Sequence, residues 1–288
     1  MTTPLSPTAF ETLATLLKTR SGLIIGMDKL YLLETRLGAL VKREKLGDLN
    51  GLAERLRRPG TDALAREVVE AMTTNESFFF RDDKPFHHFR TQALARLVAA
   101  RAPGTALRVW SAASSSGQEA YSLAMIVAES TAVLSGRKVE IVGTDIAREQ
   151  LARAREGLYS QFEVQRGLPV QMLMRYFKKE DANWRIAESI RGMAQFREHN
   201  LLSDLRSLGK FDIVFCRNVL IYFDQATKAR VLDAIAGLMP SDGLLYLGGA
   251  ETVLGITSRF APTANERGVY GVVAPASAAT PHRVAAAV

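Results

Sequence analysis

The sequence predicts an α/β protein in which a doubly wound, mostly parallel sheet follows a small all-helical domain. Residues 1–100 carry helical signals only, whereas strand and helix signals alternate through residues 101–275. Such alternation is typical of a parallel sheet with helices on both faces. The segment 211–216 is nearly all apolar, like a strand buried on both faces, and it ends at the polar pair Arg217 and Asn218. Because ligands bind beyond the carboxyl ends of such strands, this pair indicates a site.

The second region divides into six predicted strands and the helices between them. The connection 101–105 contains Pro-Gly and separates it from the helical region. Residues 157–195 interrupt the alternation and are predicted to form an inserted subdomain. The Ala-rich tail 276–288 has no periodic pattern and is predicted to be disordered. The strands are expected at residues 106–110, 139–143, 196–200, 211–216, 244–247 and 268–273, and the main helices at 117–130, 147–155 and 224–238.

Composition and charge indicate a soluble globular protein. The chain has 288 residues, of which 47% are hydrophobic and 23% charged, with a net charge of +7. No apolar run approaches the roughly 18 residues of a membrane helix, and no signal-peptide pattern begins the chain. The single cysteine, Cys216, excludes an internal disulfide and fits a reducing cytoplasm. The basic charge is compatible with an acidic partner, but many ordinary enzymes are mildly basic.

One predicted helix of the first region has a basic stripe beside its apolar face. The stripe consists of Lys29, Arg36 and Arg43, which lie seven residues apart. On the sequence alone, a solvated helix face explains it better than nucleic-acid binding, which usually adds a denser basic patch with aromatics. The apolar face follows 3-4-3 spacing and consists of Leu30, Leu33, Leu37 and Leu40.

Polar residues at the ends of the predicted strands converge on one crevice. The turn 112–117 is rich in small residues but has no G-x-G-x-x-G, which weighs against a dinucleotide. Glu119 follows in the first helical turn, where it either binds a ligand or complements the helix dipole. Asp145 ends the second strand, and ribose binding is favoured there over capping of the next helix. Asn200 ends the third strand, and the fourth ends at Arg217.

The linker 73–81 has the sequence Thr-Thr-Asn-Glu-Ser-Phe-Phe-Phe-Arg and joins the two regions. Its three aromatics are expected to pack the two domains together. His87 and His88 follow without a matching cluster of metal ligands, so we predict structural or exposed positions for them and no metal site.

Four segments of the chain carry a family resemblance. They are the linker 73–81, residues 110–122 around Glu119, residues 143–146 around Asp145, and Phe-Asp-Ile-Val-Phe-Cys-Arg-Asn-Val-Leu-Ile-Tyr-Phe-Asp at 211–224. In this order they resemble the CheR family of chemotaxis receptor glutamate methyltransferases, and the resemblance extends from residue 10 to about 273. It implies a Rossmann-like class I methyltransferase sheet, a small all-helical N-terminal domain and a small β-subdomain inserted at 157–195.

The resemblance also implies a cofactor and a set of site residues. The cofactor is S-adenosyl-L-methionine, with S-adenosyl-L-homocysteine as the product. Arg81 and Tyr222 are implied to lie near the transferred methyl group. Gln118 stands where some members have a second acid, while Glu119 and Tyr121 match the family pattern. The implied cofactor contacts are Asn75, Ser77, Arg81, Glu119, Asp145, Asn200, Leu201, Arg217 and Asn218.

The implied substrate is the glutamate side chain of a methyl-accepting chemoreceptor. The enzyme is then expected in the cytoplasm, on the helical region of the receptor, as a monomer without nucleic acid or membrane insertion. Its helical domain is implied to dock on the methylation helices, which gives the stripe of Lys29, Arg36 and Arg43 an acidic partner. Some members grip a C-terminal receptor pentapeptide through the β-subdomain. The segment 176–188 is shorter here, which leaves pentapeptide binding open.

Three other functions remain open on the sequence. One is a methyltransferase for another substrate, such as a small molecule or nucleic acid. A second is a nicotinamide oxidoreductase, which the missing glycine fingerprint disfavours. The third is a catalytically silent module that binds S-adenosylmethionine as a signal.

Overall fold

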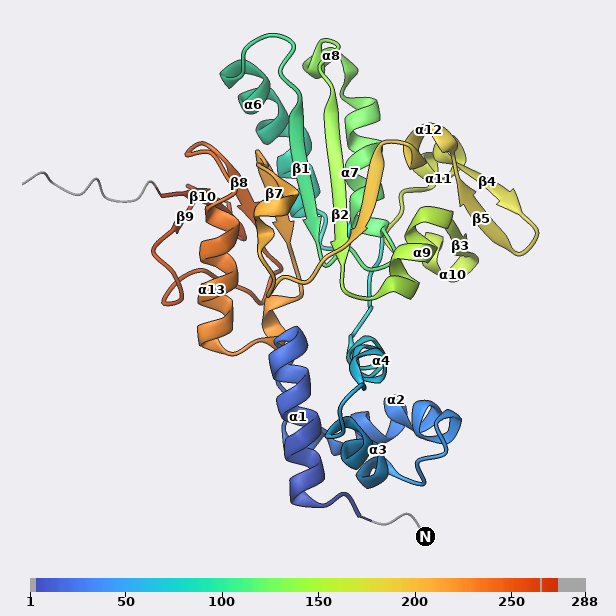
Figure 1. The fold of residues 1–288 in the computed structure, drawn as a ribbon. Coiled ribbons are helices and arrows are strands. Elements are labelled where there is room, and N and C mark those ends of the chain that lie inside the picture. The colour runs from blue at the N-terminus through green and yellow to red at the C-terminus, as the bar shows by residue number, and fades with distance from the viewer. Residues whose placement is uncertain (1–3, 265, 274–288) are drawn as a thin grey trace, which may run out of the picture.

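A seven-stranded sheet forms the centre of this protein (Figure 1). The computed structural model describes residues 4–264 and 266–273, so the tail 276–288 predicted to be disordered lies outside the described residues. The first five strands in the sheet are mutually parallel, whereas β10 is antiparallel to both of its neighbours. The predicted doubly wound sheet is therefore confirmed. The spatial order is β6 (Ala194–Glu198), β2 (Val139–Asp145), β1 (Leu107–Ala112), β7 (Ile213–Cys216), β8 (Leu244–Tyr246), β10 (Val269–Val272) and β9 (Phe260–Pro262).

Helices cover both faces of the sheet because its strands are apolar on both sides. In β7, Ile213 and Phe215 join the core on one face, and Val214 and Cys216 join the core on the other, as alternation along a strand requires. The first face is covered by α7 (Gln118–Glu129) and α9 (Arg148–Glu156), and the second by α13 (Gln225–Ala236). Short helices α8 (Thr131–Leu134) and η3 (Leu205–Leu208) lie in the connections.

Residues 84–100 pack on the sheet and not on the N-terminal helices. They form α5 (Lys84–His88), a π-helical turn η2 (Phe89–Ala93) and α6 (Leu94–Ala100). Their apolar side chains Phe86, Phe89 and Leu97 are buried in the core that α7 shares with the sheet. The sequence prediction places these residues in the helical domain 1–100, so by packing the division falls in the linker after residue 73 instead.

The N-terminal helices form a domain with a core of its own. They are α1 (Pro7–Ser21), the short η1 (Met27–Lys29), α2 (Leu30–Arg43), α3 (Leu49–Leu56) and α4 (Asp62–Met72), and their apolar faces bury a separate cluster that includes Leu13, Leu33 and Val68. Figure 1 shows this domain beyond the carboxyl ends of β1 and β2. It therefore faces the edge of the sheet at which ligands bind.

The insertion 157–195 contains a small antiparallel sheet, which confirms the predicted β-subdomain. Its strands lie in the order β3 (Leu158–Ser160), β5 (Asn183–Ile186) and β4 (Phe177–Glu180). Helices α10 (Gln161–Gln165), α11 (Val170–Tyr176) and α12 (Glu188–Arg191) accompany them. Phe79 of the linker meets the rings of Tyr159 and Phe177 edge-on, at 5.1 and 5.5 Å between centroids. The linker aromatic thus fastens the subdomain to the main domain.

All six predicted strands are present, with small differences at their ends. The third runs from 194 to 198 where 196–200 is predicted, so Asn200 lies two residues beyond it. The strand β9 at 260–262 is absent from the prediction. It has three residues and ends in Pro262, which fits an edge strand and leaves little periodic signal.

Phe215 tests how much the central core contributes to stability. Its ring is fully buried, stacks on Tyr246 at 4.2 Å between centroids, and contacts Phe86 and Phe89. We expect Phe215→Ala to lower the free energy of unfolding by about 3–5 kcal/mol in a urea titration, because it leaves a cavity. The control Val170→Ala, at a side chain that is 73% exposed, should change it by less than about 0.5 kcal/mol. Equal effects would contradict this assignment of the core.

Candidate cofactor pocket and active site

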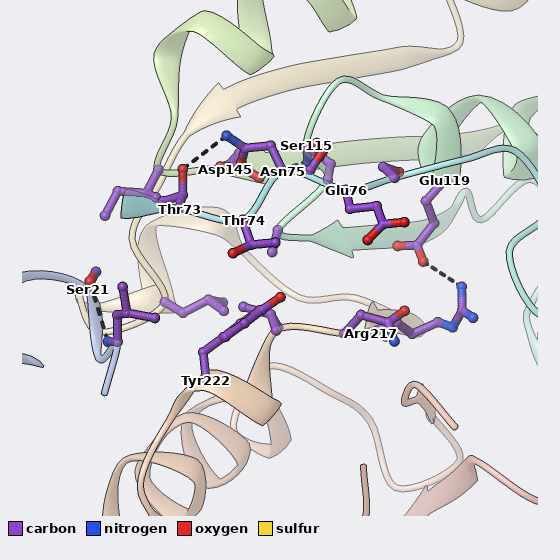
Figure 2. Close-up of a pocket in the computed structure, with 18 of the residues that line it drawn as sticks. Ser21, Thr73, Thr74, Asn75, Glu76, Ser115, Glu119, Asp145, Arg217 and Tyr222 are labelled. Carbon is purple, nitrogen blue, oxygen red and sulfur yellow. Dashed lines mark hydrogen bonds and ion pairs between the residues drawn. The ribbon is translucent and has the colours of Figure 1, made fainter. Parts of the chain in front are cut away.

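A pocket opens at the carboxyl ends of β1, β2, β6 and β7 (Figure 2). It lies where the strand order reverses, because the chain passes from β1 to β2 and β6 on one side and to β7 on the other. Its walls enclose about 1020 Å³ of space, including the open mouth.

The structure brings all ten predicted pocket residues together. Three come from the linker, one from the start of α7, one from the end of β2, and five from the segments that follow β6 and β7. The three basic residues predicted for docking do not line the pocket. The ten are Asn75, Ser77, Arg81, Glu119, Asp145, Asn200, Leu201, Arg217, Asn218 and Tyr222.

Arg217 is the most buried charge of the pocket, with 1% of its side chain exposed. Its Nη1 lies 3.1 Å from Oε2 of Glu119, as the dashed line in Figure 2 shows. Its Nη2 donates to Oδ2 of Asp82 at 2.6 Å and to the carbonyl oxygen of Arg81 at 2.7 Å. One guanidinium therefore joins β7, α7 and the linker, which holds three walls of the pocket in a fixed relation.

Glu119 is a carboxylate held on both oxygens. Its Oε1 accepts a hydrogen bond of 2.7 Å from the hydroxyl of Ser111, and its Oε2 faces Arg217. Burial raises the pKa of Glu119, although the Arg217 charge and the Ser111 hydroxyl act in the opposite direction. Both the ligand and the helix-dipole interpretation of Glu119 fit its place at the start of α7, but the pocket position favours the ligand.

Asp145 ties two turns of the pocket together. Its Oδ2 accepts from the backbone N–H of Ser115 at 2.8 Å, and its Oδ1 accepts from that of Ala147 at 2.9 Å. Burial raises the pKa of Asp145, while these backbone donors lower it. Helix α9 begins at Arg148 with Ala147 as its N-cap, so Asp145 is not the capping residue. Its carboxylate has further lone pairs for a ligand.

The loops of the pocket hold most of the unusual backbone conformations in the described part of the chain. Among residues 4–264 and 266–273, nine residues other than glycine have positive φ, and six of them lie in the three loops that carry pocket residues. Such conformations cost on the order of 1–3 kcal/mol each and persist where the surroundings hold them. The six are Phe80, Asp82, Asp83, Ala113, Ser115 and Asn218.

Three buried polar atoms on the pocket residues have no hydrogen-bond partner among residues 4–264 and 266–273. They are Oγ of Ser114, Nε2 of His199 and Nε of Arg217. Burial lowers the pKa of His199, which favours its neutral form. Because buried polar groups are normally hydrogen-bonded, three such atoms around one pocket indicate a polar ligand.

Arg81 and Tyr222 are half-buried residues that line the pocket. The Arg81 guanidinium lies 5.2 Å from the ring centroid of Phe78, and its Nη1 donates to the carbonyl oxygen of Glu76 at 3.0 Å. No carboxylate lies within ion-pair distance of Arg81 among the described residues, so its charge is available to a ligand. Figure 2 shows Tyr222 across the pocket from Thr74 and Asn75, with its side chain pointing into the pocket.

The helical domain contributes a wall that the sequence does not reveal. Ser21 and Leu23, at the end of α1 and after it, line the pocket. The N–H of Ile24 donates to the carbonyl oxygen of Tyr222 at 2.9 Å. The amide of Asn200 donates to the carbonyl oxygen of Arg20 at 2.6 Å and also accepts from the backbone N–H of Leu202. The side chain of Asn200 is therefore engaged between the domains.

The predicted basic stripe is partly committed to contacts within the chain. Arg36 donates to the carbonyl oxygens of Met72 and Thr73 at 2.7 and 3.0 Å, so it holds the linker in place. Arg43 forms ion pairs with Glu44 and Glu67, while Lys29 is exposed. The three side chains thus do not act as equivalent free charges.

Several site residues are missing from the sequence prediction. Asp82 is next to Arg81 in the chain, but only the fold shows that it meets Arg217. Ser21, Leu23 and His199 have no local signal, because the contact between two domains places them at the pocket.

The described residues hold no further candidate for a metal or membrane site. Within residues 4–264 and 266–273, no group of three or more His, Cys, Asp or Glu side chains is arranged to hold a metal ion. His88 is buried and its Nδ1 lies 2.7 Å from the hydroxyl of Tyr246, while His87 is exposed. No helix in this part of the chain is long and apolar enough to cross a membrane.

Two family models match adjacent parts of the chain. Residues 8–73 match the CheR methyltransferase all-alpha domain, and residues 75–269 match the CheR methyltransferase SAM binding domain. The chain belongs to the CheR methyltransferase family. The two matches meet in the linker, where the packing also changes from the helical core to the sheet. S-adenosylmethionine is the cofactor of this domain, and the chain is a methyltransferase that depends on it.

Curated relatives match over most of their length. The chain is 37% identical over 255 residues to the chemotaxis protein methyltransferase Cher2 of Pseudomonas putida, and this aligned stretch covers 87% of this chain and 92% of the relative. It is 40% identical over 248 residues to chemotaxis protein methyltransferase 1 of Pseudomonas aeruginosa, with 85% and 90% covered. It is 36% identical over 247 residues to the chemotaxis protein methyltransferase of Vibrio parahaemolyticus, with 85% and 89% covered.

The Arg217 contacts give a prediction about stability. Arg217→Met keeps most of the side-chain volume but leaves Glu119 buried without its counter-charge. We expect a loss of about 3–5 kcal/mol in the free energy of unfolding, as for other buried pairs that lose one partner. The matched control is Arg206→Met, because Arg206 pairs with Asp204 at 2.7 Å but is 86% exposed.

The control variant should lose no more than about 1 kcal/mol, since exposed ion pairs contribute little. Chemical denaturation followed by circular dichroism measures both. A loss for Arg217→Met no larger than that for Arg206→Met would show that the buried pair does not hold the pocket together.

Proposed function

We propose that this CheR-family methyltransferase transfers the methyl group of S-adenosylmethionine to glutamate side chains of chemoreceptors, forming methyl esters. The observation that carries the proposal is Arg81, a cation that lines the pocket and has no ion-pair partner among the described residues, whereas Arg217 is paired with Glu119 and Asp82. A free guanidinium beside the cofactor pocket suits an incoming carboxylate. The names of the relatives, chemotaxis protein methyltransferases, support a receptor as the source of that carboxylate.

The residues of the pocket fit the cofactor chemically. The Glu119 carboxylate suits the ammonium group of the methionine part, and the Asp145 carboxylate suits ribose hydroxyls. The unpartnered Oγ of Ser114 and Nε2 of His199 suit further polar groups. Asn75, Ser77, Leu201 and Asn218 line the same pocket and complete the proposed contacts.

The chain's own residues have mainly a positioning task. S-adenosylmethionine supplies an electrophilic methyl group, which leaves a neutral thioether sulfur when a carboxylate oxygen takes it. Because a glutamate side chain has a reference pKa of about 4.3, it is ionised at neutral pH and needs no general base. Arg81 orients this carboxylate without clamping it, and Tyr222 lines the path of the methyl group. The product is a neutral ester, so each turnover removes one negative charge from the target.

The helical domain is proposed to dock the acidic receptor helix in the cytoplasm. Lys29, near the start of α2, and Arg43, near its end, are both exposed, and Arg43 would exchange its ion pairs with Glu44 and Glu67 for acidic groups of a partner. Arg36 serves the linker as well, and its removal would disturb the pocket. Docking is therefore better tested at the two ends of the stripe than at its centre.

The function is tested by measuring base-labile methyl ester on receptor fragments with labelled S-adenosylmethionine. We expect wild-type protein to form the ester and Arg81→Ala to lower kcat by about 100-fold, since a misplaced reactant can cost that much. The matched control is Arg166→Ala, because Arg166 also stacks on Phe78, at 4.3 Å from its centroid, but does not line the pocket.

The control should stay within about twofold of wild type, as expected for an exposed surface pair. Methyl transfer by wild type to a small molecule or nucleic acid, with none to receptors, would contradict the proposed substrate. Binding of S-adenosylmethionine without turnover on any receptor would indicate a silent module instead.

The docking role predicts a change in KM with little change in kcat. Lys29→Glu combined with Arg43→Glu should raise the KM for receptor fragments by about 10-fold at low salt and by less at high salt, because exposed charges are screened. The control Arg206→Glu reverses an exposed charge on the sheet domain and should leave KM unchanged. If both proteins gave the same KM as wild type at low salt, the stripe would not be the docking surface.

A further inference from the structure

Glu251 lies just beyond β8 and is one of the few buried acids in the described part of the chain. It is 9% exposed, and its carboxylate accepts five backbone hydrogen bonds. Oε2 accepts from the N–H groups of Asn218 and Gly248, both at 2.7 Å. Oε1 accepts from the next three N–H groups in the chain, those of Val219, Leu220 and Ile221, at 3.0, 2.7 and 3.3 Å.

The five donors leave no acceptor capacity on Glu251 for a ligand. A carboxylate has about four lone-pair positions, and all are taken by the backbone. No basic side chain lies within ion-pair distance of Glu251 among the described residues. Its charge is instead balanced by N–H groups at the start of η4 (Leu220–Tyr222), which carry partial positive charge.

The segment that Glu251 holds is the one that carries the site. Four consecutive N–H groups, from Asn218 to Ile221, converge on one carboxylate. Arg217 precedes this segment and Tyr222 follows it, and both line the pocket. Asn218 has φ 60°, a left-handed conformation that needs support from its surroundings. The Glu251 carboxylate supplies that support from the segment after β8, of which no described residue lines the pocket.

The absence of a side chain at Gly248 is part of the same arrangement. A Cβ added to Gly248 would lie 2.6 Å from Nδ2 of Asn218 and 2.8 Å from Oε2 of Glu251. Contacts this short require the side chains of Asn218 and Glu251 to shift. The glycine therefore lets the end of β8 approach the loop closely enough for the carboxylate to reach its N–H groups.

We propose that Glu251 is a positioning residue. By holding residues 218–221, the active-site loop, it sets Asn218 at the cofactor and Tyr222 beside the path of the methyl group. This role rests on the proposed methyl transfer. A glutamine cannot replace Glu251, because its NH₂ group would face backbone donors that need an acceptor. The residue acts through the loop and not on the reacting atoms.

The test compares Glu251→Gln with a control at another carboxylate that accepts a backbone hydrogen bond but lies away from the pocket. Asp212 directly precedes β7 and therefore lies at the end of that strand away from the pocket. Like Glu251, it accepts a hydrogen bond from a backbone N–H group, that of Arg108 at 2.9 Å. Asp212→Asn loses this contact and weakens the pair with Arg101. Gly248→Ala is a second variant, which disturbs the loop without removing the carboxylate.

Three quantities are measured for each protein: the melting temperature, the Kd for S-adenosylhomocysteine by calorimetry, and kcat for receptor methylation. We expect Glu251→Gln and Gly248→Ala to lower kcat by about 10-fold or more and to weaken Kd by about threefold, since small displacements at a site have effects of this size. Asp212→Asn should lower the melting temperature while kcat and Kd stay within about twofold of wild type.

A double-mutant cycle separates positioning from general destabilisation. The loss of kcat caused by Tyr222→Phe should be much smaller in the Glu251→Gln background than in wild type, and undiminished in the Asp212→Asn background. If Glu251→Gln changed kcat and Kd no more than Asp212→Asn, or if its effect and that of Tyr222→Phe were additive, the positioning role would be wrong. If Glu251→Gln did not fold, normal kcat in Gly248→Ala would overturn it.

Failure of the proposed function gives a different result. In that case wild-type protein forms no methyl ester on receptor fragments. The Kd for S-adenosylhomocysteine then decides the positioning role alone: weaker binding in Glu251→Gln and Gly248→Ala than in Asp212→Asn supports it, and equal binding overturns it.

Discussion

The buried guanidinium of Arg217 is the contact on which the arrangement of the pocket depends. It meets Glu119 of α7 and Asp82 after the linker, and it also binds the carbonyl oxygen of Arg81. A charge that is 1% exposed is stable only when its partners are fixed, so the three segments must come together as a unit. The same contact places Glu119 inside the pocket and leaves the guanidinium of Arg81 without an ion-pair partner among the described residues.

Around this contact, the two domains and the sheet complete one site. The carboxyl ends of the strands supply Asp145 and the active-site loop, and Glu251 fixes that loop from β8. The end of α1 closes the pocket through Ile24 and Asn200, which join it to the segments after β7 and β6. The helical domain is therefore both a proposed docking surface and part of the cofactor pocket.

The sequence predicts the sheet and the strand-end residues of the pocket because both follow local rules, whereas the linker residues Asn75, Ser77 and Arg81 are implied only by the family resemblance. An apolar run ending in Arg217 and Asn218 indicates a buried strand and its ligand end, and Asp145 follows the same rule. Contacts between distant segments leave no such pattern. The pairing of Asp82 with Arg217, the use of Arg36 to hold the linker, and the placement of residues 84–100 on the sheet all depend on tertiary packing. The identity of the cofactor came from family motifs and not from the geometry of the strands.

The most direct test of the central claim, a pocket that holds the cofactor through ionised Glu119, is the affinity for S-adenosylhomocysteine as a function of pH. Burial raises the pKa of Glu119, so protonation on acidification should weaken binding at a pH above the ordinary glutamate value of about 4.3. Glu119→Gln should bind more weakly at neutral pH and lose that part of the pH dependence. Calorimetry that gave wild type and Glu119→Gln the same affinity and the same pH profile would contradict the claim.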